Sequence, residues 1–167
     1  MGRTVVPEGW LPRGEVVLDE RGREVVVWGG IPGEPAEIKE YRSDRDVVRA
    51  VWMGSPRPHP HRVEPPCDRY HGCGRCPLMH TATPLQQQSH EQIALDTLRQ
   101  RGFGEVGVSR WHQVPGERDE SQHLVRLGYG LSDRGRMRLG AWGRGTGSVV
   151  PIPACPVVTP TLRKAMK

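Results

Sequence analysis

The sequence has few large apolar side chains and no long run of them. Hydrophobic residues make up 35% of its 167 residues, and there is a single Phe. No uninterrupted apolar stretch of about 18 residues occurs, so nothing indicates a membrane-spanning helix. The first eight residues also contain no apolar core of the length that a signal peptide needs. We therefore expect no membrane partner, a cytoplasmic location and thiols that are free rather than paired in disulfides.

Two nucleotide-binding patterns are missing as well. The glycine-rich residues 143–147 are not followed by the Gly-Lys-Ser/Thr of a phosphate-binding loop, and no strand-to-helix signal surrounds them. No Asp-x-x-x-Gly-x-Gly turn follows a strand anywhere in the sequence. The sequence therefore offers no candidate catalytic residue and no candidate organic cofactor site.

Positive charge is present, and it is unevenly distributed. The net charge of +5 arises from about −1 over residues 1–66 and +6 over residues 67–167. From Arg126 onwards eight basic residues stand against Asp133 alone. Such a surface favours a polyanionic partner, although a solvated basic surface gives the same count. The candidate nucleic-acid contacts are the basic residues around a tryptophan that could stack on a base: Arg126, Arg136, Arg138, Trp142 and Arg144.

The four cysteines form the most specific pattern. Cys67, Cys73 and Cys76 have the spacing C-x5-C-x2-C, and 78 residues separate Cys76 from Cys155. A [4Fe-4S] cluster needs four thiolates, of which a short loop can supply three. Gly72 and Gly74 suggest a tight loop around the thiols. The surrounding prolines keep these segments out of helices and strands.

The spacing leaves a second metal open. Cys67, Cys73, Cys76 and His80 would make a local Cys3His zinc site, with Cys155 left over. A dithiol redox motif is disfavoured because no strand precedes Cys73 and no helix directly follows Cys76. From the spacing alone, an iron–sulfur cluster and a zinc ion are almost equally well supported.

The rest of the chain predicts a mixed β and α+β fold. After a tail at 1–13, short strands at 14–18, 23–28, 35–41 and 46–53, with a last short one at 61–63, suggest a small five-stranded barrel of oligonucleotide-binding type over 14–64. The cysteine-rich loop occupies 65–80. A partial α/β domain follows over 81–167, with a helix at about 85–101, strands at 106–111 and 123–129, and a hairpin that turns at 131–135.

Four segments together resemble the front part of the bacterial 23S rRNA uracil-5-methyltransferase family. They are Ile-Pro-Gly-Glu at 31–34, Arg-Val-Glu-Pro-Pro-Cys at 62–67, Gly-Cys-Gly-Arg-Cys at 72–76 and Cys-Pro-Val-Val-Thr-Pro at 155–160. The resemblance implies a TRAM domain, which is a five-stranded RNA-binding barrel, followed by a central α/β domain. It also implies that Cys67, Cys73, Cys76 and Cys155 bind a [4Fe-4S] cluster, which does no methyl chemistry.

In that family, a C-terminal domain binds S-adenosylmethionine and carries the catalytic residues, and these 167 residues show no counterpart to it. We therefore expect an RNA-binding, cluster-stabilised front section that is not catalytic alone, with ribosomal or transfer RNA as its partner. One alternative is half of a split methyltransferase that works with a separate cofactor-binding chain. Another is a structural zinc-binding module that contacts RNA or protein.

Overall fold

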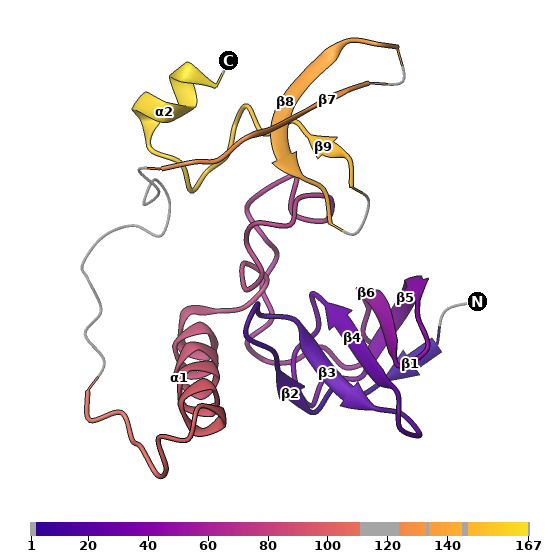
Figure 1. Ribbon diagram of the computed structural model, residues 1–167, viewed down its shortest axis with the longest axis vertical. Coiled ribbons are helices and arrows are strands. Elements are labelled where there is room, and N and C mark those ends of the chain that lie inside the picture. The colour runs from indigo at the N-terminus through magenta and orange to yellow at the C-terminus, as the bar shows by residue number, and fades with distance from the viewer. Residues whose placement is uncertain (1–2, 111–123, 133, 145–146, 167) are drawn as a thin grey trace. The chain divides into compact units, whose positions relative to one another are not determined.

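A computed structural model describes residues 3–110, 124–132, 134–144 and 147–166. The chain divides into two compact units, each built from two stretches of sequence (Figure 1). The first unit comprises Met1–Glu64 and Pro77–Trp111, and the second comprises Pro65–Cys76 and His112–Lys167. The three cysteines of the loop therefore belong to the same unit as Cys155.

The first unit contains a six-stranded curled sheet with the strand order β1-β5-β6-β4-β3-β2. All neighbouring strands are antiparallel except β4 and β6, which run parallel. The strands are β1 (Arg3–Val5), β2 (Gly9–Trp10), β3 (Val16–Asp19), β4 (Glu24–Trp28), β5 (Ala36–Ser43) and β6 (Val47–Gly54).

The expected five-stranded barrel is wrong. The segment taken for an N-terminal tail supplies two strands, because Arg3 pairs with Ile38 and Gly9 pairs with Val17. The last strand expected, at 61–63, is absent, and Arg62 makes only an isolated bridge with Thr81. Compared with the expectation, the sheet has two additional short strands, and within the described ranges no strand joins β1 to β2. These two strands are therefore its edges.

Alternation along the strands places small β-branched side chains on one side of this sheet. Val16, Val25, Val27 and Ile38 are almost completely buried. Trp10, Leu18 and Trp52 are partly buried and pack against the same cluster. The core is thin, in keeping with the low hydrophobic content of the sequence.

The helix α1 (Thr83–Gln100) lies within the second stretch of the first unit. Pro84 lies in its first turn, and Ala82 is the N-cap residue. Its buried residues are Leu85 and Ser89, whereas Leu98, near its end, is exposed. No helix in the described ranges has the combination of length and apolar character that crossing a membrane requires.

The second unit contains a three-stranded antiparallel sheet with the order β7-β8-β9. The strands are β7 (Gly128–Leu131), β8 (Met137–Trp142) and β9 (Val149–Val150), and a short helix, α2 (Pro160–Ala165), follows. The expected hairpin is confirmed, with Gly135 in the left-handed conformation at φ 69° within the turn.

The strands expected at 106–111 and 123–129 do not form over these ranges. Residues 106–110 are irregular, and Trp111 lies outside the described residues. Of 123–129, His123 also lies outside them, and the strand begins only at Gly128.

Gly140 is required where β8 meets β9, because a Cβ there would lie 2.0 Å from the carbonyl oxygen of Val150.

Candidate metal centre

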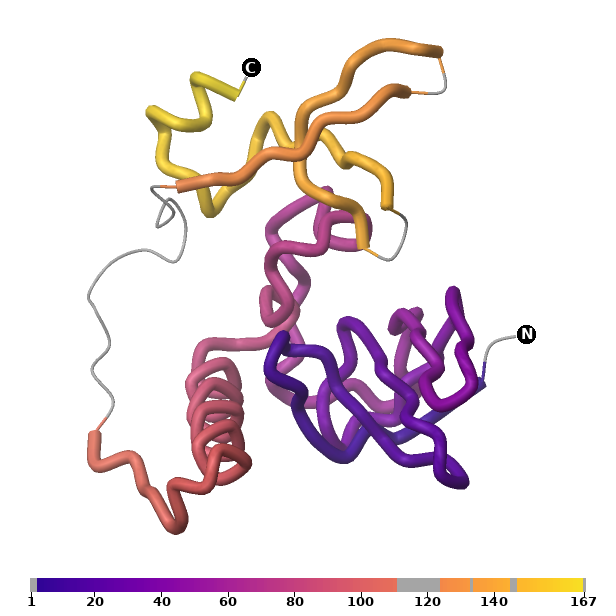
Figure 2. The backbone as a smooth tube through the Cα atoms, in the orientation of Figure 1, coloured from indigo at the N-terminus to yellow at the C-terminus, as the bar shows by residue number. Residues whose placement is uncertain are grey.

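The cysteine loop is a succession of turns with neither helix nor regular strand (Figure 2). The amide of Tyr70 donates to the carbonyl of Cys67 at 2.9 Å, and the amide of Cys73 donates to that of Arg69 at 2.7 Å. These bonds fold the five residues between Cys67 and Cys73 back on themselves. Cys67 and Cys73 therefore lie in one compact local structure.

The end of β8 holds this loop in place. Cys73 forms an isolated antiparallel bridge with Gly143, and the amide of Arg144 donates to the carbonyl of Gly72 at 3.0 Å. The Nη2 atom of Arg144 donates to the carbonyls of Tyr70 at 2.9 Å and Cys73 at 2.8 Å. Its guanidinium carbon also lies 5.2 Å from the centre of the Tyr70 ring. One arginine thus fixes both ends of the segment that leads into Cys73.

The fourth cysteine reaches the same region from the segment after β9. Cys155 is buried in a cluster with Ala141, Ile152 and Val158, and the partly buried Cys73 packs against this cluster. Cys67 and Cys155 line one small pocket of about 60 Å³, together with Asp68, Arg69, Ile152, Pro153 and Ala154. Two distant parts of the sequence therefore bring thiols to a common pocket.

The thiols influence one another electrostatically. The pKa of Cys76 is raised from 9.0 to about 11, mainly by burial and further by the neighbouring Cys155, Cys73 and Cys67. Burial also raises the pKa of Cys67, with Cys155 and Cys73 adding to the effect. In the metal-free protein these two groups are protonated at neutral pH. A bound cation reverses this preference because thiolates are its ligands.

The donor set is chemically suited to a [4Fe-4S] cluster. All four cysteines are free thiols, and four thiolates are the usual ligands of such a cluster. Among the described residues, no group of three or more Cys, His, Asp or Glu side chains has an arrangement that could hold a metal ion. The fit therefore rests on the four thiols and on the pocket that two of them share.

The two loop glycines have a smaller structural role than their positions suggest. Neither Gly72 nor Gly74 has a positive φ. A Cβ at Gly72 would come no nearer than 3.9 Å to Val150, and one at Gly74 no nearer than 3.5 Å to the carbonyl of Trp142. These are ordinary contacts, so the expected tight turn does not depend on either glycine.

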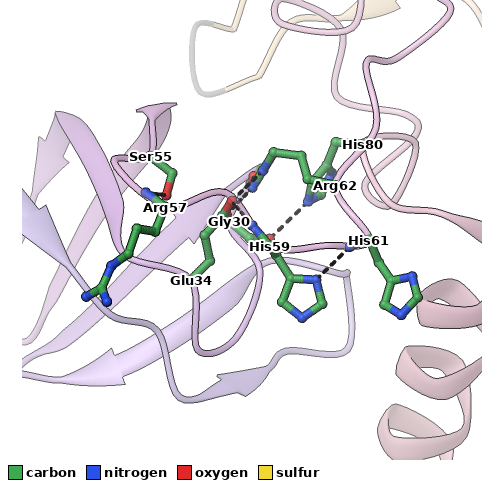
Figure 3. A network of polar contacts seen from close by, with 9 residues as sticks. Gly30, Glu34, Ser55, Arg57, His59, His61, Arg62 and His80 are labelled. Carbon is green, nitrogen blue, oxygen red and sulfur yellow. Dashed lines mark hydrogen bonds and ion pairs between the residues drawn. The ribbon is translucent and has the colours of Figure 1, made fainter.

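His80, the histidine of the zinc alternative, is part of the first unit. It is buried, and its Nε2 donates to the carbonyl of Gly30 at 3.0 Å (Figure 3). Close by in sequence, Arg62 forms an ion pair with the buried Glu34, whose Oε1 also accepts from the amide of His59. The backbone amide of His61, in the same segment before the cysteine loop, donates to Nδ1 of His59.

The five candidate RNA-contacting residues all lie in the second unit, but their exposure to solvent differs. Arg126, Arg136 and Arg138 are exposed, and Trp142 is 58% exposed. Arg138 and Trp142 are four residues apart on β8 and therefore point to the same face of the sheet. Arg144 is half-buried, with its guanidinium on the loop carbonyls. Contact of these five residues with RNA remains a prediction.

Sequence reasoning missed the anchoring role of Arg144. The residue was noticed only as a neighbour of Trp142, and it lies 71 positions after Cys73, whose carbonyl it binds. A basic residue near the end of a strand carries no local signal for such a bond. The role of Gln86 was missed too: its side-chain amide donates to the carbonyls of Leu78 and Thr81 at the start of α1.

No family model matches the chain. Individual proteins do match it over nearly its whole length. It is 31% identical over 98% of its residues to a 23S rRNA (uracil(1939)-C(5))-methyltransferase RlmD of Pectobacterium atrosepticum, and 28% identical over 99% to the protein of that name in Halomonas elongata. The identity to the protein of that name in Edwardsiella ictaluri is 34% over 89% of the chain.

The chain matches only part of each of these relatives. It spans 36% of the Pectobacterium protein, 34% of the Halomonas protein and 34% of the Edwardsiella protein. The match is to their N-terminal part. About two thirds of each relative therefore has no counterpart in these 167 residues.

Proposed function

Because this chain is homologous to the N-terminal part of the 23S rRNA uracil-C5-methyltransferases, we propose that it is an RNA-binding module stabilised by a [4Fe-4S] cluster. The observation that carries the proposal is the near-complete match of the chain to proteins whose names specify 23S rRNA as substrate. Ribosomal RNA is accordingly the proposed partner, with transfer RNA as the related alternative. Bacterial RNA of either kind implies a cytoplasmic location.

The cluster part of the proposal is supported by the thiols of the second unit. Cys67, Cys73, Cys76 and Cys155 would hold the cluster, and they come from two segments that pack on the same hydrophobic cluster and pocket. The cluster would supply structural cross-linking rather than methyl transfer. Zinc is the alternative metal, with His80 as its fourth ligand in place of Cys155.

The RNA part is supported by the exposed basic side of the β7–β8 hairpin. Arg138 and Trp142 share one face of β8, and an exposed indole beside a guanidinium can stack on a base while the cation meets phosphate. Arg136 and Arg126 add positive charge in the segments next to the hairpin. The first unit, whose residues 1–66 carry a net charge of about −1, is a weaker candidate for phosphate contacts.

The family resemblance of the sequence implies that methyl transfer belongs to a C-terminal domain, which lies in the part of the relatives that these residues do not match. We therefore propose that the 167 residues bind RNA without transferring a methyl group by themselves. A second candidate function is one half of a split methyltransferase, active with a separate chain that binds S-adenosylmethionine. The short span of the match, about a third of each relative, favours this candidate over an independent enzyme.

The test is binding to a structured fragment of 23S rRNA, followed by fluorescence anisotropy at several salt concentrations. Binding should weaken as salt rises, because phosphate contacts release counterions. Arg138→Glu should weaken binding by about tenfold and reduce the salt dependence. Arg45→Glu makes the same charge change at an exposed position of the first unit and should have a much smaller effect. Equal losses in the two variants would contradict an interface on the hairpin.

A further inference from the structure

One face of the β7–β8 hairpin is apolar and exposed. Tyr129 pairs with Leu139 and Leu131 pairs with Met137 across the two antiparallel strands. Directly opposed residues point to the same face, as do residues two apart along a strand. These four side chains, which we call the apolar face, therefore lie together on one side of the hairpin. Their exposed fractions are 75%, 55%, 76% and 70% for Tyr129, Leu139, Leu131 and Met137.

The opposite side of the same hairpin has a different character. It carries Arg138 and Trp142, with Gly128, Gly130 and Gly140 between them. The ring of Trp142 lies over Gly128, since a Cβ on that glycine would be 2.8 Å from the indole. A two-sided hairpin of this kind normally buries its apolar side and exposes its basic side. Here the four side chains of the apolar face are each more than half exposed, whereas Ala141, farther along the same side of β8, is buried with Ile152, Cys155 and Val158.

The neighbouring edge of the sheet is also open. β7 is the outer strand in the order β7-β8-β9, and within the described residues no strand pairs with its far side. The strand contains no charged residue or proline of the kind that protects an edge from pairing. The residues just before it include Leu124, which is 74% exposed, and Leu127. An open edge beside a bare apolar face is a surface suited to further polypeptide.

RNA does not fit this face. None of its four side chains is cationic, whereas RNA binding draws on cations that neutralise phosphates. The cations of the hairpin lie elsewhere, with Arg138 on the opposite side. A protein surface with exposed apolar side chains is the complementary partner.

The comparisons offer one polypeptide as the occupant of this surface. The chain accounts for 34–36% of each relative described above, so most of their polypeptide is not represented in it. We propose that the apolar face and the β7 edge dock the polypeptide that corresponds to the unmatched part of these relatives. This docking proposal rests on the proposed function only for the identity of the partner. It assigns the surface by which the RNA-binding module contacts a catalytic part.

The first experiment titrates this chain with the unmatched part of the Pectobacterium protein, produced as a separate chain whose folding is checked by circular dichroism. Sedimentation velocity measures the complex. Leu139→Glu should weaken it by about tenfold or more, because a carboxylate would replace a leucine at a buried contact. Arg138→Glu, one residue away on the opposite side, should leave it within about twofold.

The second experiment needs no separately folded partner. A chimera carries these 167 residues in place of the matched part of the Pectobacterium protein, and hydrogen exchange is compared with that of the isolated chain. The amides of β7 should exchange more slowly in the chimera because the edge is paired or covered. Leu139→Glu should restore fast exchange, and Arg138→Glu should not.

Three outcomes would overturn the proposal. One is the absence of both a complex and added protection at β7. Another is an equal loss of binding in the two variants. The third is self-association of the isolated chain that Leu139→Glu removes, which would make a second copy the occupant. RNA binding is measured in parallel: it should survive Leu139→Glu, so failed docking with intact RNA binding counts against this inference and not against the proposed function.

Discussion

Arg62 holds the carboxylate of Glu34 in a two-pronged ion pair inside the first unit. Its Nε donates to Oε1 at 2.7 Å, its Nη2 contacts Oε2, and the Glu34 side chain is fully buried (Figure 3). Nη2 of Arg62 also donates to the carbonyl of Gly29, and the guanidinium stacks 4.1 Å from the Trp52 ring. The pair joins the turn at residues 31–34 to the linker that leads into the cysteine loop.

Removing Arg62 should strongly destabilise the first unit. Arg62→Met leaves Glu34 as an unpaired buried charge, which costs about 3–5 kcal/mol of the free energy of unfolding. Urea denaturation followed by tryptophan fluorescence measures the change. Arg42→Met breaks the ion pair of Arg42 with Asp44, whose side chains are 66% and 52% exposed, and should cost less than about 1 kcal/mol. Similar losses in the two variants would refute the buried-charge explanation.

Cys155→Ser should remove the iron–sulfur cluster from protein prepared without oxygen. The change takes away one of four proposed thiolate ligands, so the brown absorption and the iron content per chain should fall to near zero. Ala154→Ser, at the exposed neighbouring residue, introduces the same hydroxyl and should keep the cluster. Both variants are measured by visible absorption and iron analysis.

The same preparation decides between the two metals. A colourless wild-type protein that holds one zinc and loses it in His80→Ala would replace the cluster by the Cys3His site. A brown Cys155→Ser protein would show instead that Cys155 is not a ligand. In either case, the convergence of Cys155 on the pocket beside Cys67 would serve packing alone.

Arg144→Met should loosen the cysteine loop. It removes the donor to the carbonyls of Tyr70 and Cys73, and hydrogen bonds made by charged groups contribute about 1.5–3 kcal/mol each. We expect the metal-free variant to lose about 2–4 kcal/mol of stability in thermal denaturation. Arg136→Met, at an exposed position, should change it little. A variant with normal stability and weak RNA binding would assign Arg144 to RNA contact alone.

The metal-free protein should become less stable at alkaline pH. The folded pKa of Cys76 is about 11 against an ordinary value of 9.0, so the folded state binds its proton more tightly than the unfolded state. This contribution is present below about pH 9 and is lost as pH rises from 9 towards 11. Urea midpoints at pH 8, 9.5 and 10.5 measure the loss, and Cys76→Ala should make it shallower. A slope unchanged by Cys76→Ala would show that other groups cause it.

Local patterns predicted the parts of the fold whose signals are local. Turn glycines and alternating residues indicated β3, β4, β5, β6 and the hairpin of β7 and β8, and a proline marked the start of α1. The edge strands β1 and β2 were missed because each has three residues or fewer, too short for an alternation to register. Without them, a six-stranded curled sheet was taken for a five-stranded barrel.

Long-range partners could not be predicted in the same way. The segments at 31–34 and 62–67 were both recognised as motifs, yet nothing in either indicates that Glu34 pairs with Arg62 across 28 residues. The cysteine spacing suggested a shared site, and the structure adds the pocket between Cys67 and Cys155. The apolar face was not foreseen, because its pattern is that of any half-buried hairpin and only the solvent exposure distinguishes it.

The close approach of β8 and β9 at Gly140 has a consequence for length variation among proteins built this way. Cys73 forms a bridge with Gly143 just beyond β8, and Cys155 follows the end of β9 by five residues. The positions of the loop cysteines and of Cys155 therefore both depend on the pairing of β8 with β9. Insertions between Cys76 and β7 would leave the distances among the sulfurs unaltered. A single-residue slip of β9 along β8 would carry Cys155 away from the other three, however well every loop were preserved.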